Sequence, residues 1–266
     1  MNAFDYARPS SLSDALAGVQ TPEAKLLAGG QTLLAAMKLG LAAPEALIDL
    51  ADVPELKGLR IEADTIRIGA MTTHAEVAAN ADVQRLIPAL ADVAHHIGDR
   101  QVRHRGTLGG SLANNDPAAC YPAAVLGLGA TIHAQLGSHS RSIAADDFFK
   151  GLYETALTEG EIITAVSFPV PVRAAWQKFK QPASRFSLVG VFVSSGPQGV
   201  RVAVTGAGAC VFRAGELEQR LKADWSAAAL DGASFSAEGL NSDLHGSAEY
   251  RAALIPVLAR RAVAAS

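Results

Sequence analysis

Two glycine pairs, each placed between an apolar run and a segment of helical character, constrain this chain more than any other feature. The first pair is Gly29-Gly30 and the second is Gly109-Gly110. Glycine lets backbone N–H groups approach a ligand closely and adopts backbone angles closed to other residues. A helix that starts after such a loop also offers unpaired N–H donors to a diphosphate. Two loops of this kind predict one elongated, phosphate-bearing ligand held at two places.

Either glycine pair taken singly is consistent with an ordinary turn between a strand and a helix. Neither pair matches the dinucleotide fingerprint G-x-G-x-x-G or the phosphate loop of nucleoside triphosphatases. The presence of two such loops favours a ligand. So do the polar residues that trail the second loop, which are Asn114, Asn115 and Asp116.

The bulk properties of the chain exclude several classes of protein. Its 266 residues carry a net charge of -3 with a pI near 6.2, so we expect no basic surface for nucleic acid. No apolar run is long enough for a membrane span, and the first residues do not resemble a secretory signal. The sequence therefore predicts a cytoplasmic protein.

The cysteines and histidines show no pattern of metal ligands. Cys120 and Cys210 lack C-x-x-C spacing, so this chain alone cannot build a four-cysteine iron–sulfur cluster. The histidine pair His95-His96 has no accompanying cysteine or carboxylate cluster. We predict no metal site, and any redox centre held here must then be organic.

Hydrophobic periodicity and capping signals predict short strands mixed with helices. Thr72 or Thr73 begins a helix that runs through Asn80, with Glu76 placed for a capping box. In the first part of the chain we also predict strands at 24–29, 47–50, 65–69 and 130–135, and helices at 31–39, from 82 toward 97, and from 116 to 128. Beyond a turn-rich boundary at 168–173, we predict antiparallel strands at 177–179, 188–194 and 200–204, then helices at 216–222 and 248–263. The absence of regular βαβ spacing indicates an α+β fold.

The sequence resembles a known family, the medium (flavoprotein) subunit of molybdenum hydroxylases. That family includes bacterial carbon monoxide dehydrogenase and the flavin part of xanthine dehydrogenase. The resemblance lies first in the two loops, Ala28-Gly29-Gly30-Gln31-Thr32-Leu33-Leu34 and Arg105-Gly106-Thr107-Leu108-Gly109-Gly110-Ser111, which are similar to the FAD-binding loops of the family. It continues through 153–155, 161–164, 178–185 and 202–208. The match spans nearly the whole chain and weakens only in the last fifty or so residues.

The resemblance implies a fold and a domain division. We expect a two-lobed FAD-binding domain of the PCMH type over 1–172. A smaller α/β C-terminal domain of the carbon monoxide dehydrogenase flavoprotein type is expected over 173–266, with an antiparallel sheet and helices packed on one face. The residue patterns alone are compatible with this division but could not have produced it.

The resemblance also implies a set of cofactor-binding residues. In the first loop, Leu27 and Ala28 are expected to bring the end of a strand beside the cofactor. The backbone N–H groups of Gly29, Gly30, Gln31 and Thr32, with the Thr32 hydroxyl, are expected at the diphosphate. In the second loop they are Thr107, Gly109, Gly110, Ser111, Asn115 and Asp116, with Asp116 expected at the hydroxylated chain of FAD. Ile163 is expected at the flavin ring, Lys180 near its pyrimidine end and Ile97 over the adenine. Each has an ordinary structural alternative, such as a helix cap, a core position or a solvated lysine.

The chain departs from the family pattern at two positions beside the second loop. Asn114 stands where relatives often carry histidine, and Cys120 stands where many have a carboxylate. Neither departure replaces the glycines or Asp116, so FAD binding is still expected.

The function implied by the resemblance is electron transfer within a molybdenum hydroxylase. The implied partners are a large molybdopterin-binding subunit and a small subunit with [2Fe-2S] clusters, assembled as a dimer of heterotrimers. FAD held in this chain would pass electrons to a quinone, NAD or oxygen, and no catalytic acid, base or nucleophile is needed here. We expect the lone chain to lose FAD. The alternatives are a free-standing FAD oxidoreductase and a non-redox scaffold that has lost FAD.

Overall fold

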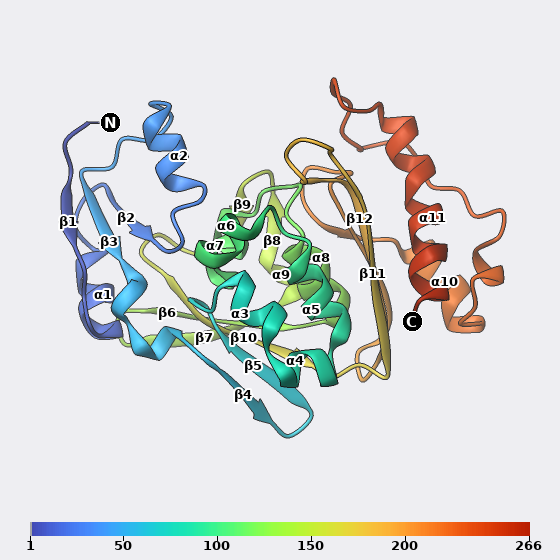
Figure 1. The fold of residues 1–266 in the computed structure, drawn as a ribbon, viewed down its shortest axis with the longest axis horizontal. Coiled ribbons are helices and arrows are strands. Elements are labelled where there is room, and N and C mark those ends of the chain that lie inside the picture. The colour runs from blue at the N-terminus through green and yellow to red at the C-terminus, as the bar shows by residue number, and fades with distance from the viewer. Residues whose placement is uncertain (1) are drawn as a thin grey trace.

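The computed structural model describes residues 2–266, which form three main β-sheets arranged side by side (Figure 1). The first sheet, with its helices, forms the first lobe, and the second sheet with its helices forms the second lobe. The third sheet carries the C-terminal helices on its outer side (Figure 1). This mixture of helices and mainly antiparallel sheets confirms the α+β fold class.

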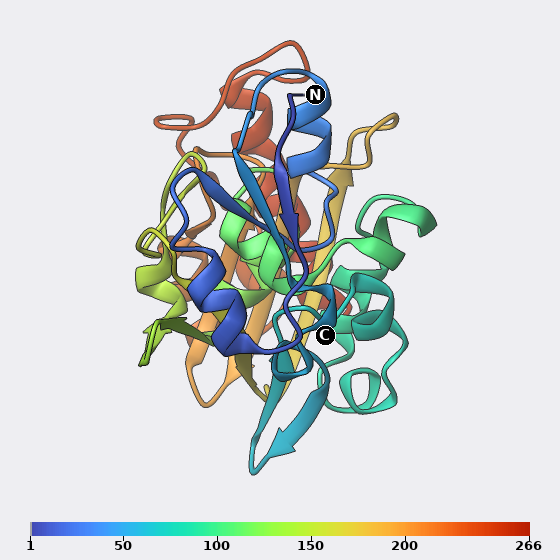
Figure 2. The same ribbon diagram turned by 90° about the vertical axis from the view of Figure 1, so that its left-hand side faces the viewer.

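The first lobe is a small parallel sheet covered by short helices. Its strand order is β1-β3-β2, and the apolar side chains of Leu16, Ile48 and Leu50 form its core. Its strands are in front in the view of Figure 2. Its elements are β1 (Asp5–Ala7), α1 (Leu12–Gly18), β2 (Ala24–Leu27), α2 (Leu33–Lys38), β3 (Ala46–Asp49), and two 3-10 turns, η1 (Leu50–Asp52) and η2 (Pro54–Leu56).

The second lobe is an antiparallel sheet of order β4-β5-β10-β6-β7 with a layer of helices on it. Its strands are β4 (Leu59–Glu62), β5 (Thr65–Gly69), β6 (Thr131–Leu136), β7 (His139–Ala144) and β10 (Ile162–Pro169). Its helices are α3 (His74–Ala79), α4 (Ala81–Leu86), α5 (Pro88–His95), α6 (Arg100–Arg105), α7 (Leu108–Asn114), α8 (Tyr121–Leu128) and α9 (Ala145–Phe148). A two-stranded hairpin, β8 (Phe149–Gly151) and β9 (Glu154–Thr155), completes it. Every residue of α8 is buried, so this helix is the centre of the core.

Local capping chemistry explains where several of these helices begin. Thr73 caps α3 in a reciprocal capping box with Glu76, as predicted. The single helix predicted from Asp82 toward Ile97 is wrong, because α4 ends at Leu86 and α5 begins at Pro88. Proline lacks an N–H and clashes with the preceding turn, so it starts a helix more readily than it continues one.

The helix predicted to begin at Asp116 and Pro117 also starts later than expected. The Asp116 side chain accepts a hydrogen bond from the Ala118 N–H at 2.8 Å, but this closes only a turn. The helix itself begins at Tyr121, with Pro122 in its first turn. The loop that precedes α8 is therefore longer than predicted, and its residues 118–120 are available to line a cavity.

The third sheet is antiparallel and has both faces buried. Its strands are β11 (Arg173–Lys180), β12 (Ser187–Gly196), β13 (Gly199–Thr205) and β14 (Phe212–Arg213), in that order, and this confirms the strands predicted here. Val191 and Val204 pack toward α10 (Gly215–Ala223) and α11 (Ala248–Ala264), whereas Trp176 and Phe192 join the core of the second lobe. Another short 3-10 turn, η3 (Ala228–Leu230), follows α10.

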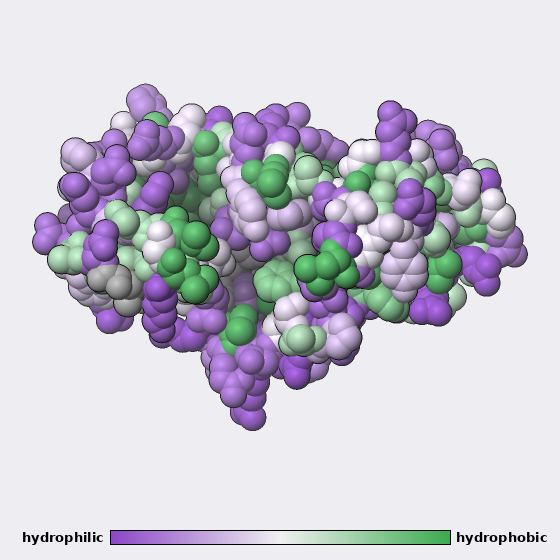
Figure 3. Space-filling model, turned by 90° about the horizontal axis from the view of Figure 1, so that it is seen from above, coloured by the Kyte–Doolittle hydropathy of each residue, from purple (hydrophilic) through white to green (hydrophobic). Residues whose placement is uncertain are grey.

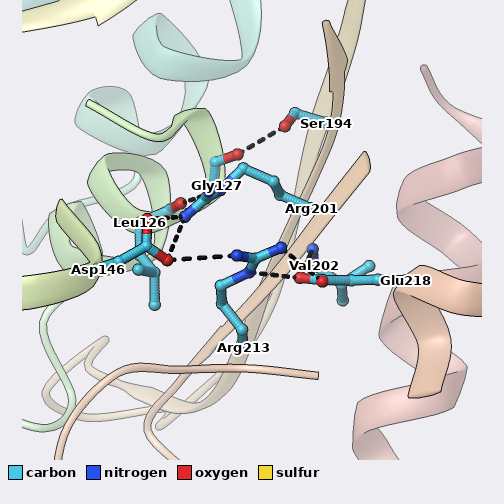
Figure 4. A network of polar contacts seen from close by, with 8 residues as sticks. All are labelled: Leu126, Gly127, Asp146, Ser194, Arg201, Val202, Arg213 and Glu218. Atoms are coloured by element: carbon cyan, nitrogen blue, oxygen red, sulfur yellow. Dashed lines mark hydrogen bonds and ion pairs between the residues drawn. The ribbon is translucent and has the colours of Figure 1, made fainter. Parts of the chain in front are cut away.

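A network of polar contacts ties the third sheet to the second lobe (Figure 4). Buried Arg201 on β13 donates from Nε to the Leu126 carbonyl at 2.8 Å and pairs through Nη2 with Asp146 on α9 at 2.6 Å. Arg213 links the same carboxylate to Glu218 on α10. Burial works to raise the pKa of Asp146, but the two arginines hold it below its ordinary value. The network holds the C-terminal end of α8, whose other end reaches the cavity described next.

Candidate cofactor-binding site

A cavity of about 720 Å³ lies where the two lobes and the third sheet meet. The hollow on the face shown in Figure 3 lies between the first lobe and the middle of the molecule. The cavity is lined by the loop that follows β2, by α7 and the loop after it, by residues 157–163, and by the β11–β12 connection. These segments include both glycine pairs, so the structure brings together the two loops predicted from the sequence.

The first loop offers free donors to this cavity. The backbone N–H groups of Gly29, Gly30, Gln31 and Thr32 donate to no acceptor within residues 2–266. Gly30 has φ +72°, a conformation that glycine adopts without strain. Four adjacent N–H groups with no protein partner suit an anion, because an anion can accept hydrogen bonds from several of them at once.

The second loop uses its backbone donors within the protein. The Gly109 N–H donates to the Ala70 carbonyl at 2.8 Å, and the Gly110 N–H donates to the Thr107 hydroxyl at 3.1 Å. A Cβ at Gly109 would come 2.6 Å from the Cβ of Ala70, so this glycine is required for close packing. The second loop therefore faces the cavity with side chains, chiefly those of Ser111, Asn114 and Asp116.

Most of the predicted residues line the cavity. They are Ala28, Gly29, Gly30, Gln31, Thr32, Thr107, Gly109, Gly110, Ser111, Asp116 and Ile163. Leu27, Asn115 and Lys180 are not among the lining residues. Leu27 lies between Leu26 and Ala28, which do line it, and side chains alternate along a strand.

Asn115 has a structural position instead. It is fully buried, its backbone is left-handed with φ 43°, and its Nδ2 donates to the Gly151 and Glu154 carbonyls at 2.9 and 2.7 Å. Asparagine tolerates this conformation better than most residues. The side chain thus ends α7 and anchors the β8–β9 hairpin.

Lys178 is a lining residue that sequence reasoning missed. Its Nζ donates to the His96 carbonyl at 3.0 Å and to the Cys120 Sγ at 3.2 Å. Lys180 is exposed, and the pairing register between β11 and β12 shifts between Phe179 and Lys180. The available signal was the pattern Lys-Phe-Lys on one strand, in which both lysines were candidates for one face.

Two further lining residues differ sharply in exposure. Phe186, in the β11–β12 connection, lines the cavity and keeps 47% of its surface exposed. His74 is buried, and its Nδ1 has no hydrogen-bond partner within the described chain. Burial, with a smaller effect of Arg103, lowers the pKa of His74 to about 4, so this imidazole is neutral at pH 7.

The described residues hold no cluster of three or more histidine, cysteine, aspartate or glutamate side chains suited to a metal ion. Both cysteines are free thiols. Among residues 2–266 there is also no helix that combines the length and the apolar character needed to cross a membrane. The wall of the cavity combines backbone donors, hydroxyl groups, apolar side chains and the carboxylate residues Asp116, Glu159 and Glu161.

Comparison with known proteins identifies the class. Residues 2–171 match the family described as the FAD binding domain in molybdopterin dehydrogenase, and the chain belongs to this family. It is 39% identical to the nicotine 6-hydroxylase medium subunit of Paenarthrobacter nicotinovorans over 98% of this chain and 96% of that protein. It is 34% identical to the carbon monoxide dehydrogenase medium chain of Hydrogenophaga pseudoflava over 99% of this chain and 96% of that one.

Solved structures agree with this assignment. The chain superposes on a chain of the Cu,Mo-CO dehydrogenase with a TM-score of 0.90 at 33% identity, covering 99% of this chain and 97% of that one. A chain of quinoline 2-oxidoreductase from Pseudomonas putida 86 gives a TM-score of 0.88 at 31% identity, with 99% and 96% covered. The protein is thus an FAD-binding medium subunit of the molybdenum hydroxylase family, as the sequence predicted.

Proposed function

We propose that this chain carries electrons within a heterotrimeric molybdenum hydroxylase, with FAD in the cavity described above. A large subunit would hold the molybdenum cofactor, and a small subunit would hold [2Fe-2S] clusters. Two such heterotrimers would pair in the cytoplasm. FAD supplies the ability to accept electrons singly and release them in pairs. The observation that carries the proposal is the row of unpaired N–H groups from Gly29 to Thr32 in the cavity wall.

The residues present fit this cofactor. The first loop provides donors for a diphosphate, and the cavity volume of about 720 Å³ lies within the range of sites for large organic ligands. A Cβ at Gly29 would meet the Arg105 carbonyl, so glycine at this position lets the first loop pack directly against the end of α6. Asp116 can accept hydrogen bonds from hydroxyl groups but would repel phosphates, so it belongs beside the hydroxylated chain.

Asp116 lies at the end of the cavity that borders the β11–β12 connection. It lines both the main cavity and a second cavity of about 280 Å³, which is bounded by Gln181, Ser184 and Phe186 of the β11–β12 connection. At this end of the cavity Asp116 would accept hydrogen bonds from the hydroxylated chain of FAD. Ile97 neighbours the same end, since Lys178 binds the His96 carbonyl and Arg185 binds that of Gly98.

This chain then positions the ring and limits its contact with water. Apolar side chains such as Ile163 and Ile97 shield one end of the cavity, and Phe186 stays exposed at its rim. No side chain is required to act as an acid, base or nucleophile. Substrate specificity would belong to the large subunit.

The experiment is an absorption spectrum of the complex purified from its native host, with its chains identified by mass spectrometry. Flavin absorption together with iron–sulfur absorption and two further subunits would support the proposal. Flavin in a solitary chain would favour a free-standing oxidoreductase. A chain without flavin, without partners and without uptake of added FAD would favour a scaffold.

A further inference from the structure

Four arginine side chains form a basic surface beside the cavity, and we call them the arginine surface. Arg100, Arg103 and Arg105 belong to α6, and Arg185 belongs to the β11–β12 connection. Arg103 is half-buried, and the other three are exposed. Arg185 lines the cavity, and α6 contributes Val102 to the same wall. The arginine surface is therefore continuous with the wall of the cavity.

Two of these guanidinium groups meet at a single backbone acceptor. The Arg103 Nη1 donates to the Ile97 and Gly98 carbonyls at 3.1 and 3.3 Å, and the Arg185 Nη1 donates to the same Gly98 carbonyl at 3.3 Å. A cation of α6 and a cation of the β11–β12 connection thus lie close together, where like charges repel. A guanidinium has five N–H donors, so most donors of both groups remain for another acceptor.

No carboxylate of the described chain balances this charge. None of the four arginines forms an ion pair within residues 2–266. The neighbouring Asp99 caps α6, because its side chain accepts a hydrogen bond from the Val102 N–H at 2.8 Å. The whole chain has a net charge of -3, so the positive charge is a local property of this surface. Arginine stays charged at any pH that a protein tolerates, and such a cluster attracts anions.

We propose that the arginine surface docks an acidic face of the iron–sulfur partner subunit, with partner carboxylates bound between Arg103 and Arg185. This inference rests on the proposed function, because it requires a partner that delivers electrons to FAD in the cavity. That partner has to approach the cavity, and the arginine surface borders it. Guanidinium groups bind carboxylates through two parallel hydrogen bonds, and arginine is enriched in protein interfaces. Complementary charge also sets the orientation of the two subunits.

The first test measures how fast the full chain, loaded with FAD, associates with the remaining subunits of the complex at several salt concentrations. Variants R100E and R185E are compared with R261E, the matched control. Arg261 is exposed on α11 and forms no ion pair within the described residues. We expect R100E and R185E to lower the association rate at low salt by about threefold to tenfold and to weaken its salt dependence. R261E should match the wild type. Equal association rates in R100E, R185E and the wild type, with FAD bound in all three, would overturn the proposal.

A second test identifies the subunit that is bound. R100K and R185K keep the positive charge and introduce an amine that a carbodiimide joins directly to a neighbouring carboxylate. We expect the cross-linked peptides of both variants to contain aspartate or glutamate residues of the iron–sulfur subunit, whereas R261K should give none. Cross-links to the large subunit alone, or none, would overturn the proposal. So would binding of inorganic phosphate at these arginines in the lone chain while subunit association is unaffected by R100E and R185E. A native complex that contains no iron–sulfur subunit would instead overturn the proposed function, and this inference with it.

Discussion

Gly29 and Arg105 meet backbone to backbone: a Cβ at Gly29 would lie 2.1 Å from the Arg105 carbonyl oxygen. The first glycine loop and the end of α6 are thus locked together, although they are far apart in sequence. Gly29 and Gly106, the residue after Arg105, both line the cavity, so the two lobes meet at its wall. The contact also places the unpaired N–H groups of the first loop beside the second loop.

Replacing Gly29 by alanine should therefore disturb cofactor binding. The added methyl group meets backbone atoms that cannot rotate away, so the two loops must separate, at a cost of about 1–3 kcal/mol. We expect G29A to weaken FAD binding by about tenfold or more, measured by titration of apo protein. The control is G215A, because a Cβ at Gly215 meets nothing within 4 Å. Equal FAD affinity in G29A and wild type would contradict the assignment of this loop.

Asn115 is expected to act on stability through the β8–β9 hairpin. Alanine at this position would lose two hydrogen bonds to the Gly151 and Glu154 carbonyls and would occupy a left-handed conformation that disfavours it. We expect N115A to lower the free energy of unfolding by about 2–4 kcal/mol, measured by urea denaturation. N115G restores the backbone freedom alone and should recover part of this loss. A stability of N115A equal to that of the wild type would show that these bonds contribute nothing.

Much of the fold followed from local signals in the sequence. The capping box of Thr73 and Glu76 and the alternating strands of the third sheet depend on residues close together in the chain. The break at Pro88 was also readable, because proline starts helices, but the prediction continued the helix past this residue.

Local signals could not predict that the two loops use their backbone N–H groups differently. Both loops contain Gly-Gly, but the Gly109 N–H is taken by the carbonyl of Ala70, a residue distant in sequence, while the first loop meets no such acceptor. The exposed position of Lys180 likewise follows a register shift between β11 and β12 that lies between Phe179 and Lys180. These hydrogen-bond partners and this strand register are set by tertiary packing, so they cannot be predicted from composition or residue spacing.

His74 should make the stability of the protein depend on pH. Burial lowers its pKa in the folded state to about 4, below the ordinary value of 6.5, so the unfolded chain binds more protons between these values. The free energy of unfolding should therefore fall as the pH drops from 6.5 to 4, with a slope of at most about 1.4 kcal/mol per pH unit from this residue. H74Q should flatten the slope in this window, measured by urea denaturation at several pH values. An unchanged slope in H74Q would assign the effect to other groups.

Arg201 is expected to hold the second lobe and the third sheet together. Its guanidinium is buried and serves both the Leu126 carbonyl at the end of α8 and the Asp146 carboxylate. Its loss would leave these acceptors without their partner, so we expect R201M to lower the free energy of unfolding by about 3 kcal/mol. The exposed pair of Arg260 and Asp231 provides the matched control, because R260M removes a solvent-exposed ion pair and should cost less than about 1 kcal/mol.

The ion pairs of Asp146 in this network should also make the stability of the protein fall at acidic pH. Arg201 and Arg213 hold the pKa of Asp146 below its ordinary value of 3.8, despite the opposing effect of burial. The stability that the carboxylate contributes is therefore fully present above 3.8 and is lost as the pH falls through its lower value in the folded state. D146N should remove this acid-dependent component, and the difference in unfolding free energy between wild type and D146N should shrink below pH 3.8. A difference that stays constant down to pH 2 would show that the ion pairs with Asp146 do not hold these parts together.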